Sequence, residues 1–109
     1  MNLRLLLLPF AAVFLLSSCK PMLTIPNDED AVRAANKGID ISTGQLQQSR
    51  QLYINKCGSC HTLYLPNKYK GPMWEQVLNE MSQRAKLTED EKKDLLTYLI
   101  IMSEKPKSK

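Results

Sequence analysis

The sequence predicts an all-α fold, with about three short helices in one small domain. Three segments carry apolar residues at helical spacing, and no segment alternates apolar and polar residues as a half-buried strand does. The chain has 109 residues. We assign the helices to residues 43–109, because the residues before them have the composition of a targeting signal and a linker. A domain of that size has a marginal apolar core, so we expect something other than side chains to fill its centre.

The first predicted helix covers residues 44–57, with Thr43 as a possible N-cap. Leu46, Tyr53 and Cys57 fall on one face of it at helical spacing. The helix runs directly into the sequence CGSCH, residues 57–61.

Two further helices follow a loop, because residues 62–72 contain two prolines, an asparagine and a glycine. Pro72 suits the first turn of the second predicted helix. The apolar stripe of that helix consists of Trp74, Val77, Leu78 and Met81. The third predicted helix opens with Thr88 and Glu91 at capping-box spacing and stops before Pro106. Its apolar face consists of Leu95, Tyr98, Leu99 and Met102.

Residues 1–18 have the features of a secretory signal peptide: a basic residue at Arg4, an apolar run from Leu5 to Leu16, and small residues after it. The run contains Pro9 and is shorter than the roughly 20 residues that a spanning helix needs. A short uncleaved anchor is the alternative. Removal of this segment would lower the formal net charge from +4 to +3, which is too mild to indicate a nucleic-acid partner.

Cys19 ends the sequence LSSC, which resembles the lipoprotein box of bacteria, where the cysteine becomes the lipid-modified N-terminus. The alternative is a free or disulfide-bonded cysteine near an ordinary cleavage site. We expect residues 19–42 to be the lipidated cysteine and a flexible tether, because this stretch has two early prolines and no sustained period. Within it, residues 30–38 could form a short helical turn that ends at Gly38. The expected location is outside the cytoplasm, lipid-anchored to a bacterial membrane, with the domain in the periplasm or at the cell surface.

The sequence CGSCH has the C-x-x-C-H pattern of covalent c-type haem attachment. Cys57 and Cys60, three residues apart, can reach the two vinyl groups of one porphyrin, and His61 can then bind the iron. A structural zinc site would need four ligands, and a thioredoxin-like redox pair would need a βαβ context, so both are disfavoured. A plain disulfide with an incidental histidine is the remaining alternative. We expect one covalent haem c.

The sixth iron ligand cannot be a second histidine of the same chain, because His61 is the only histidine in the sequence. The methionines after Cys19 are Met22, Met73, Met81 and Met102. We favour Met81, which follows His61 by twenty residues and can cross the haem edge. Met73 is the alternative ligand, and packing in the core is the alternative role for Met81.

Residues 43–104 resemble the small, single-haem class I cytochromes c of bacteria. The resemblance is carried by Tyr53 four positions before Cys57, CGSCH, Gly71-Pro72, WEQVLNEM and LTEDEKKDLLTYL. In one branch of that family a tryptophan precedes the ligand methionine by seven residues, as Trp74 precedes Met81. The resemblance implies helices packed around the haem, with Trp74 in the haem pocket. It also implies a proline carbonyl that accepts a hydrogen bond from the proximal imidazole, with Pro72 as the first candidate and Pro66 as the second.

The family also crosses its first and last helices at a small residue packed with aromatic residues. The corresponding positions here are Ser49, Tyr53 and Tyr98. Ser49 departs from the glycine that is usual in the family.

The predicted function is one-electron transfer between periplasmic or membrane redox proteins, and not enzymatic catalysis. Iron held by His61 and Met81 has no open position for a substrate. A basic ring near the haem edge could steer an acidic partner; it consists of Lys56, Lys68, Lys70, Arg84 and Lys86. The alternatives are a five-coordinate haem sensor or small-ligand binder, in which Met81 only packs, and an accessory haem subunit of an oxidoreductase complex.

Overall fold

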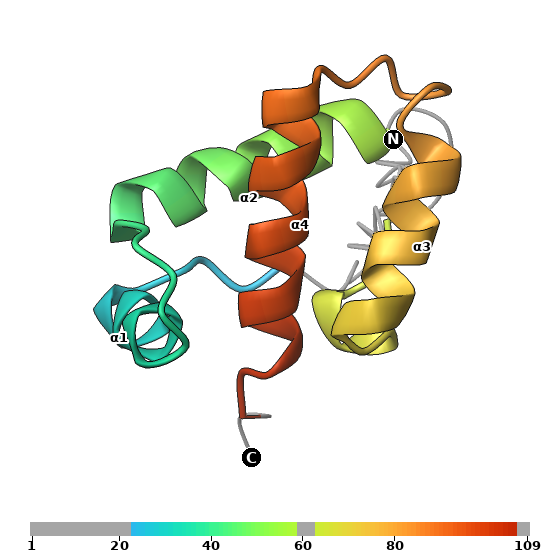
Figure 1. Cartoon of the computed structure of the whole chain (residues 1–109). Helices are drawn as coiled ribbons and strands as arrows, with labels where there is room; N and C mark the ends of the chain where they lie inside the picture. The colour runs from blue at the N-terminus through green and yellow to red at the C-terminus, as the bar shows by residue number, and fades with distance from the viewer. Residues whose placement is uncertain (1–22, 59–62, 107–109) are drawn as a thin grey trace, which may run out of the picture.

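The computed structural model describes residues 23–58 and 63–106, and this part of the chain contains helices and no strand (Figure 1). The elements are α1 (Asp28–Asn36), α2 (Thr43–Cys57), the short 3-10 helix η1 (Pro66–Lys68), α3 (Gly71–Met81) and α4 (Glu89–Ser103). The all-α prediction is confirmed. The three expected helices are present as α2, α3 and α4, and α1 is an addition to them.

The helix boundaries follow local capping chemistry. Thr88 caps α4 as predicted, because its hydroxyl accepts a hydrogen bond from the Glu91 backbone N–H while the Glu91 carboxylate accepts one from Thr88 N–H. The N-cap of α2 is Ser42 and not Thr43, since Ser42 makes the same reciprocal pair of bonds with Gln45. Pro72 lies in the first turn of α3, where its missing N–H costs nothing.

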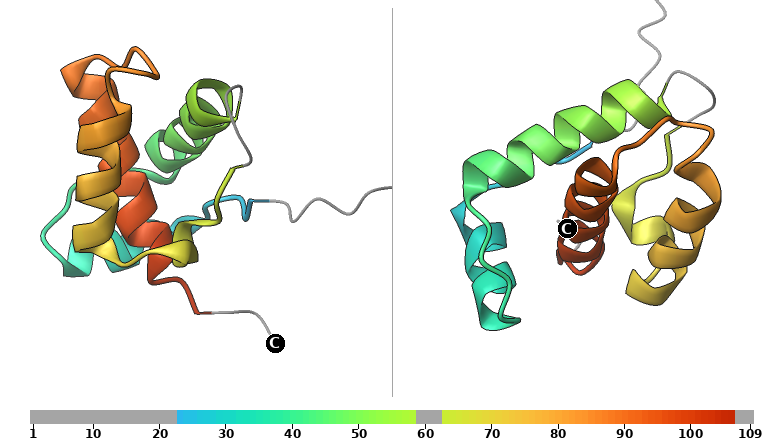
Figure 2. Two further views of the ribbon diagram at one scale, coloured as in Figure 1. Left: turned by 90° about the vertical axis from the view of Figure 1, so that its right-hand side faces the viewer. Right: turned by 45° about the horizontal axis from the view of Figure 1, so that its top comes forward.

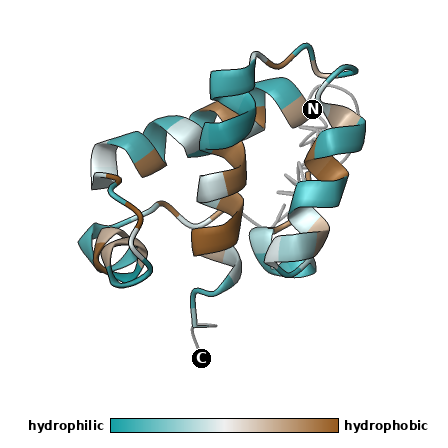
Figure 3. Ribbon diagram, in the orientation of Figure 1, coloured by the Kyte–Doolittle hydropathy of each residue, from teal (hydrophilic) through white to brown (hydrophobic). Residues whose placement is uncertain are grey.

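Helix α4 is the central element: α1 and α3 lie on its two sides, and α2 crosses it, so that the end of α2 reaches the side of α3 (Figure 1). The backbones of α2 and α3 do not pack against each other; both pack against α4. Apolar residues are concentrated along the middle and the C-terminal half of α4, and its first turn is hydrophilic (Figure 3). The main core consists of Leu23, Tyr53, Trp74, Leu78, Leu95, Tyr98, Leu99 and Met102. At the crossing of α2 and α4 the rings of Tyr53 and Tyr98 lie 6.1 Å apart between centroids, and Ser49 is buried nearby on α2.

The prediction of a flexible tether over residues 19–42 is wrong for its described part, residues 23–42. Helix α1 packs against both α2 and α4, as the second view in Figure 2 shows. Ala34 of α1, Leu46 of α2 and Ile101 of α4 have no exposed surface and form a second apolar cluster. The segment therefore belongs to the folded domain.

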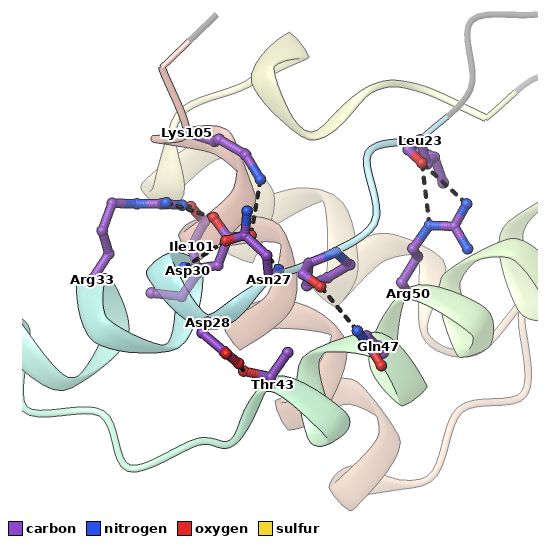
Figure 4. Close-up of polar contacts among 11 residues, drawn as sticks. Leu23, Asn27, Asp28, Asp30, Arg33, Thr43, Gln47, Arg50, Ile101 and Lys105 are labelled. Carbon is purple, nitrogen blue, oxygen red and sulfur yellow. Dashed lines mark hydrogen bonds and ion pairs between the residues drawn. The ribbon is translucent and has the colours of Figure 1, made fainter. Parts of the chain in front are cut away.

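Polar contacts fasten this segment to the rest of the domain (Figure 4). The carboxylate of Asp30 is fully buried and pairs with Arg33 on α1 and with Lys105 just after α4. Arg33 also donates a hydrogen bond of 2.7 Å to the carbonyl of Ile101. These contacts join residues nearly seventy positions apart in the sequence, so the N-terminal segment and the end of α4 hold each other in place.

No helix in the described residues is both long enough and apolar enough to cross a membrane. The expected signal peptide, residues 1–18, and the expected lipidation site, Cys19, lie outside the described residues.

Candidate cofactor site

A cavity of about 470 Å³ separates the last turn of α2 from α3. Its walls come from three parts of the chain: Tyr53, Lys56 and Cys57 of α2; Tyr64 and Tyr69 of the following loop; and Trp74, Val77, Leu78, Glu80, Met81, Arg84 and Ala85 of α3 and the turn after it. Most of these side chains are apolar or aromatic. The cavity therefore lies between the predicted helices, in a part of the small domain that side chains do not fill.

Cys57, the first residue of the C-x-x-C-H motif, is the last residue of α2 and is half-buried in the wall of this cavity. Cys60 and His61 lie outside the described residues, which resume at Leu63. A Cβ built on Gly58 would lie 3.3 Å from Cδ1 of Leu63. Cys57 before this connection and Tyr64 after it both line the cavity, so the covalent connection that carries Cys60 and His61 starts and ends beside the cavity.

Met81 lines the cavity at the end of α3, and Met73 does not. Met73 lies in the first turn of α3 and is 45% exposed. Trp74 and Met81, which the sequence pairs by their spacing, both face the same cavity, with Val77 and Leu78 between them. Of the two methionines proposed as iron ligands, the structure brings Met81 to the space next to Cys57.

Two hydrogen bonds, one buried and one partly buried, hold the loop that follows the motif. The indole Nε1 of Trp74 donates to the carbonyl oxygen of Pro66 over 2.7 Å. The hydroxyl of Tyr53 donates to the carbonyl oxygen of Tyr64, also over 2.7 Å. Burial raises the pKa of the Tyr53 hydroxyl well above its usual value, so this hydroxyl remains a donor at any ordinary pH. One bond comes from α2 and one from α3, so the loop is tied to both walls of the cavity.

Sequence reasoning missed an aromatic cluster around the cavity. The ring of Trp74 meets those of Tyr53 and Tyr69 edge-on, with centroid distances of 6.2 Å and 5.1 Å. Tyr69 in turn meets Tyr64 at 6.0 Å. Edge-to-face geometry at these distances is favourable for aromatic rings. Tyr64 and Tyr69 lie in the segment expected to be an irregular loop, and two tyrosines in a loop of eleven residues were the available signal.

The structure does not bring Pro72 to the cavity. Pro72 is exposed and lines a separate groove, with Glu75 on α3 and Ile100 on α4 among its neighbours. Pro72 and Trp74 are two residues apart on α3, so they point to different faces of the helix, and only the face with Trp74 lines the cavity. Pro66, the second candidate, is buried, and its carbonyl already accepts the Trp74 indole hydrogen. A carbonyl oxygen has two lone pairs, so this bond leaves one acceptor site on Pro66.

The expected basic ring is only partly assembled around the cavity. Lys56 and Arg84 line it, together with the acidic Glu80. Lys68 lies over the ring of Tyr64, with its Nζ 5.2 Å from the centroid, an arrangement that favours a cation. Lys70 lines the same groove as Pro72, and Lys86 is an exposed residue in the left-handed region, with φ of 54°.

The residues around the cavity fit a covalently attached haem. The space is aromatic and apolar, it is open at one wall to the first cysteine of a C-x-x-C-H motif, and it has a thioether side chain on another wall. In the described residues no group of three or more His, Cys, Asp or Glu side chains could hold a metal ion by itself. An all-α fold built around such a site defines a c-type cytochrome.

Comparison of the sequence with protein families identifies the family. The model of the dihaem cytochrome c family matches residues 53–109, more than half of the chain. The chain belongs to the dihaem cytochrome c family, and is thereby a haem-binding electron-transfer cytochrome with covalent haem c. No curated protein and no solved structure matches it. The family is described as dihaem, whereas this sequence contains one C-x-x-C-H motif and one histidine.

Proposed function

We propose that this chain is a single-haem cytochrome that transfers one electron at a time between redox proteins. The observation that carries the proposal is the meeting of Cys57 and Met81 at one cavity, in a sequence with one motif for haem attachment. Bound haem supplies a one-electron oxidation and reduction of its iron. The protein supplies the covalent attachment, the axial ligands and the exclusion of water from the haem faces.

In this proposal each attachment residue has one role. Cys57 and Cys60 form the two thioethers, His61 is the proximal iron ligand and Met81 is the distal one. A thioether ligand raises the reduction potential relative to a second histidine. Both axial positions are then filled, so the protein has no open position for substrate and is not an enzyme. Lys56 and Arg84, which line the cavity, would face an acidic surface of the redox partner.

A visible spectrum of the haem-loaded protein tests the ligation. The non-lipidated variant Cys19→Ser keeps the whole folded chain and is the suitable background. We expect a weak far-red band of iron–thioether origin in the oxidised protein and no carbon monoxide adduct in the reduced protein. Met81→Ala should lose the band and bind carbon monoxide, and Met73→Ala, the matched control, should keep the wild-type spectrum. A high-spin wild-type spectrum with ready carbon monoxide binding would instead favour the five-coordinate sensor or ligand binder.

Haem stoichiometry tests the single-haem proposal against the description of the family. Intact mass of the denatured protein counts the covalent haems, and total haem per chain from an alkaline pyridine spectrum counts all of them. We expect one haem per chain by both measurements. A second haem per chain would contradict the proposal and would require axial ligands beyond His61 and Met81.

We further propose that Cys19 carries lipid and that the domain is held at a bacterial membrane on the periplasmic or outer side. The sequence LSSC after an apolar signal supports this. The wild-type protein should fractionate with membranes and the Cys19→Ser variant should be released in soluble form with its haem attached. Soluble wild-type protein would exclude the lipid anchor but would leave the haem proposal intact.

A further inference from the structure

The first described residue, Leu23, is already fixed to the folded domain. Its side chain is 6% exposed and belongs to the main core. Its carbonyl oxygen accepts hydrogen bonds from Nε and Nη2 of Arg50 on α2, over 3.2 Å and 3.0 Å. Three residues further on, the carbonyl of Pro26 accepts a hydrogen bond of 3.0 Å from Gln47 (Figure 4). The chain therefore joins the domain at Leu23.

This attachment leaves very little chain between the domain and the proposed lipid. Three residues stand between Cys19 and Leu23, and even a fully extended chain would span no more than about 14 Å over that distance. A flexible tether over residues 19–42 would instead have a root-mean-square length of about 27 Å and could extend much further. A lipid on Cys19 would thus hold Leu23 within about 14 Å of the lipidated residue at the membrane surface.

The surface at this point is formed by three segments that lie side by side: the N-terminal segment, the loop containing η1, and the end of α4 (Figure 2). A groove of about 380 Å³ runs between them. It is lined by Thr24, Leu65, Pro66, Asn67, Met102, Lys105 and Pro106. We define the anchor face as the exposed surface of residues 23–25, 65–68 and 105–106.

The chemistry of the anchor face suits a membrane surface. Ile25 is 58% exposed, one of the most exposed large apolar side chains in the described residues. The lysine in the lining of the groove, Lys105, is already paired with the buried Asp30. The exposed basic side chain of the anchor face is therefore Lys68, next to Asn67 at the edge of the groove. Exposed apolar and basic side chains together favour the interface of a bilayer that contains anionic lipid.

We propose that the anchor face rests on the bilayer that holds the lipid of Cys19, so that the domain has a fixed orientation and does not swing on a tether. This inference rests on the lipid anchor proposed above. The occupant of the anchor face is the lipid headgroup layer. Only three residues separate Leu23 from the lipidated Cys19, so the bilayer that holds the lipid is the surface nearest to the face.

The orientation places the haem cavity close to the membrane. Pro66 lines the groove of the anchor face, and its carbonyl accepts the hydrogen bond of Trp74, which lines the cavity. The loop that contains η1 thus separates the groove of the anchor face from the haem cavity. Electron exchange with the partner would then take place beside the bilayer surface.

Energy transfer from a headgroup-labelled lipid to the haem measures this proximity. The lipidated, haem-loaded protein is reconstituted in vesicles of phosphatidylcholine and phosphatidylglycerol that carry the dye. We expect strong transfer for the wild type and a drop of about twofold or more when some ten Gly and Ser residues are inserted after Met22, because the flexible insertion lets the domain move away.

A pair of matched substitutions tests the face itself. Ile25→Glu introduces a charge on the anchor face, and Val32→Glu introduces one at an equally exposed position of α1, since Val32 is 59% exposed. We expect lower transfer for Ile25→Glu alone. Transfer that is weak in the wild type, or that the insertion does not change, would overturn the proposal. Wild-type protein that is soluble and carries haem would also overturn it through the absent anchor, while leaving the electron-transfer function standing.

Discussion

Replacement of Asp30 by Asn tests whether the N-terminal segment is part of the domain. Oδ2 of Asp30 accepts hydrogen bonds from the backbone N–H of Asn27 over 2.8 Å and from Nζ of Lys105 over 3.0 Å. The substitution puts an amide NH₂ at one of the two oxygen positions, and it removes the negative charge that faces Lys105 and Arg33. If residues 23–42 were a tether, this change would have no effect on stability.

The size of the effect follows from these contacts. A hydrogen bond to a charged group contributes about 1.5–3 kcal/mol, so the loss of two would cost about 3–6 kcal/mol. The side chains of Arg33 and Lys105 are 25% and 23% exposed, and water can partly replace their lost partner. We therefore expect the free energy of unfolding to fall by about 2–4 kcal/mol, a large share of the stability of a small domain.

Denaturant unfolding of the haem-loaded, non-lipidated protein measures this change, and Asp28→Asn is the matched control. Asp28 lies two residues earlier on α1, and its exposed carboxylate accepts a hydrogen bond from the Thr43 hydroxyl, which an Asn carbonyl can also do. The control should shift stability by less than about 0.5 kcal/mol. Equal and small effects for both variants would refute the assignment of residues 23–42 to the folded domain.

The effect of Asp30 also depends on pH. Burial raises the pKa of this carboxyl, but hydrogen bonds from the Asn27 backbone, Lys105 and Arg33 lower it more, so its net pKa lies below the ordinary value of 3.8. The ionised carboxylate therefore stabilises the fold at pH above the ordinary value, and this contribution is lost as the pH falls through the lowered pKa. The stability difference between wild type and Asp30→Asn should be constant above about pH 5 and should shrink below pH 4.

Three further substitutions test the interior beside the cavity. Tyr53→Phe should lower the free energy of unfolding by about 0.5–1.5 kcal/mol, because it removes the hydrogen bond to the Tyr64 carbonyl. Tyr98→Phe should leave stability unchanged or raise it, because the buried Tyr98 hydroxyl has no hydrogen-bond partner among the described residues; a loss as large as that of Tyr53→Phe would show a partner for it. Trp74→Phe should cost about 1–3 kcal/mol, because it leaves the buried carbonyl of Pro66 without its indole donor. All three values come from denaturant titrations of the haem-loaded protein, and an unchanged midpoint for Trp74→Phe would contradict the role given to its indole hydrogen.

The parts of the fold that the sequence predicted correctly are those whose signals are local. The capping box at Thr88 and the apolar period of α4 fix that helix without reference to the rest of the chain. The spacing of Trp74 and Met81 places both on one side of α3, and the structure gives them a common cavity. The haem motif is likewise a contiguous sequence, and the family comparison agrees with it.

The sequence indicated at most a short helical turn ending at Gly38, and not the packed helix α1, because the buried face of α1 is not apolar. Only Asp30 and Ala34 are buried on it, one charged and one small, so no hydrophobic period stands out. The signals that were present are the capping box formed by Asn27 and Asp30, with an acidic residue in place of the usual Glu or Gln, and Gly38 just after the helix with φ of 77°. Such caps show that a helix can form, but its packing depends on Ile101 and Lys105, far away in the sequence.

The packing of α1 determines how far the chain can be truncated from its N-terminus without loss of the fold. A chain that began at residue 43 would expose Leu46 and Ile101, which now have no exposed surface. Exposure of a buried Leu or Ile side chain costs about 1.5–3 kcal/mol, so the two together would remove about 3–6 kcal/mol. We therefore expect residues 43–109 to give little haem-loaded protein and a lower unfolding midpoint than the chain from residue 20 onwards. Equal yields and midpoints for the two would mean that α2, α3, α4 and the haem are sufficient for the fold, and that α1 serves only to shorten the distance to the membrane.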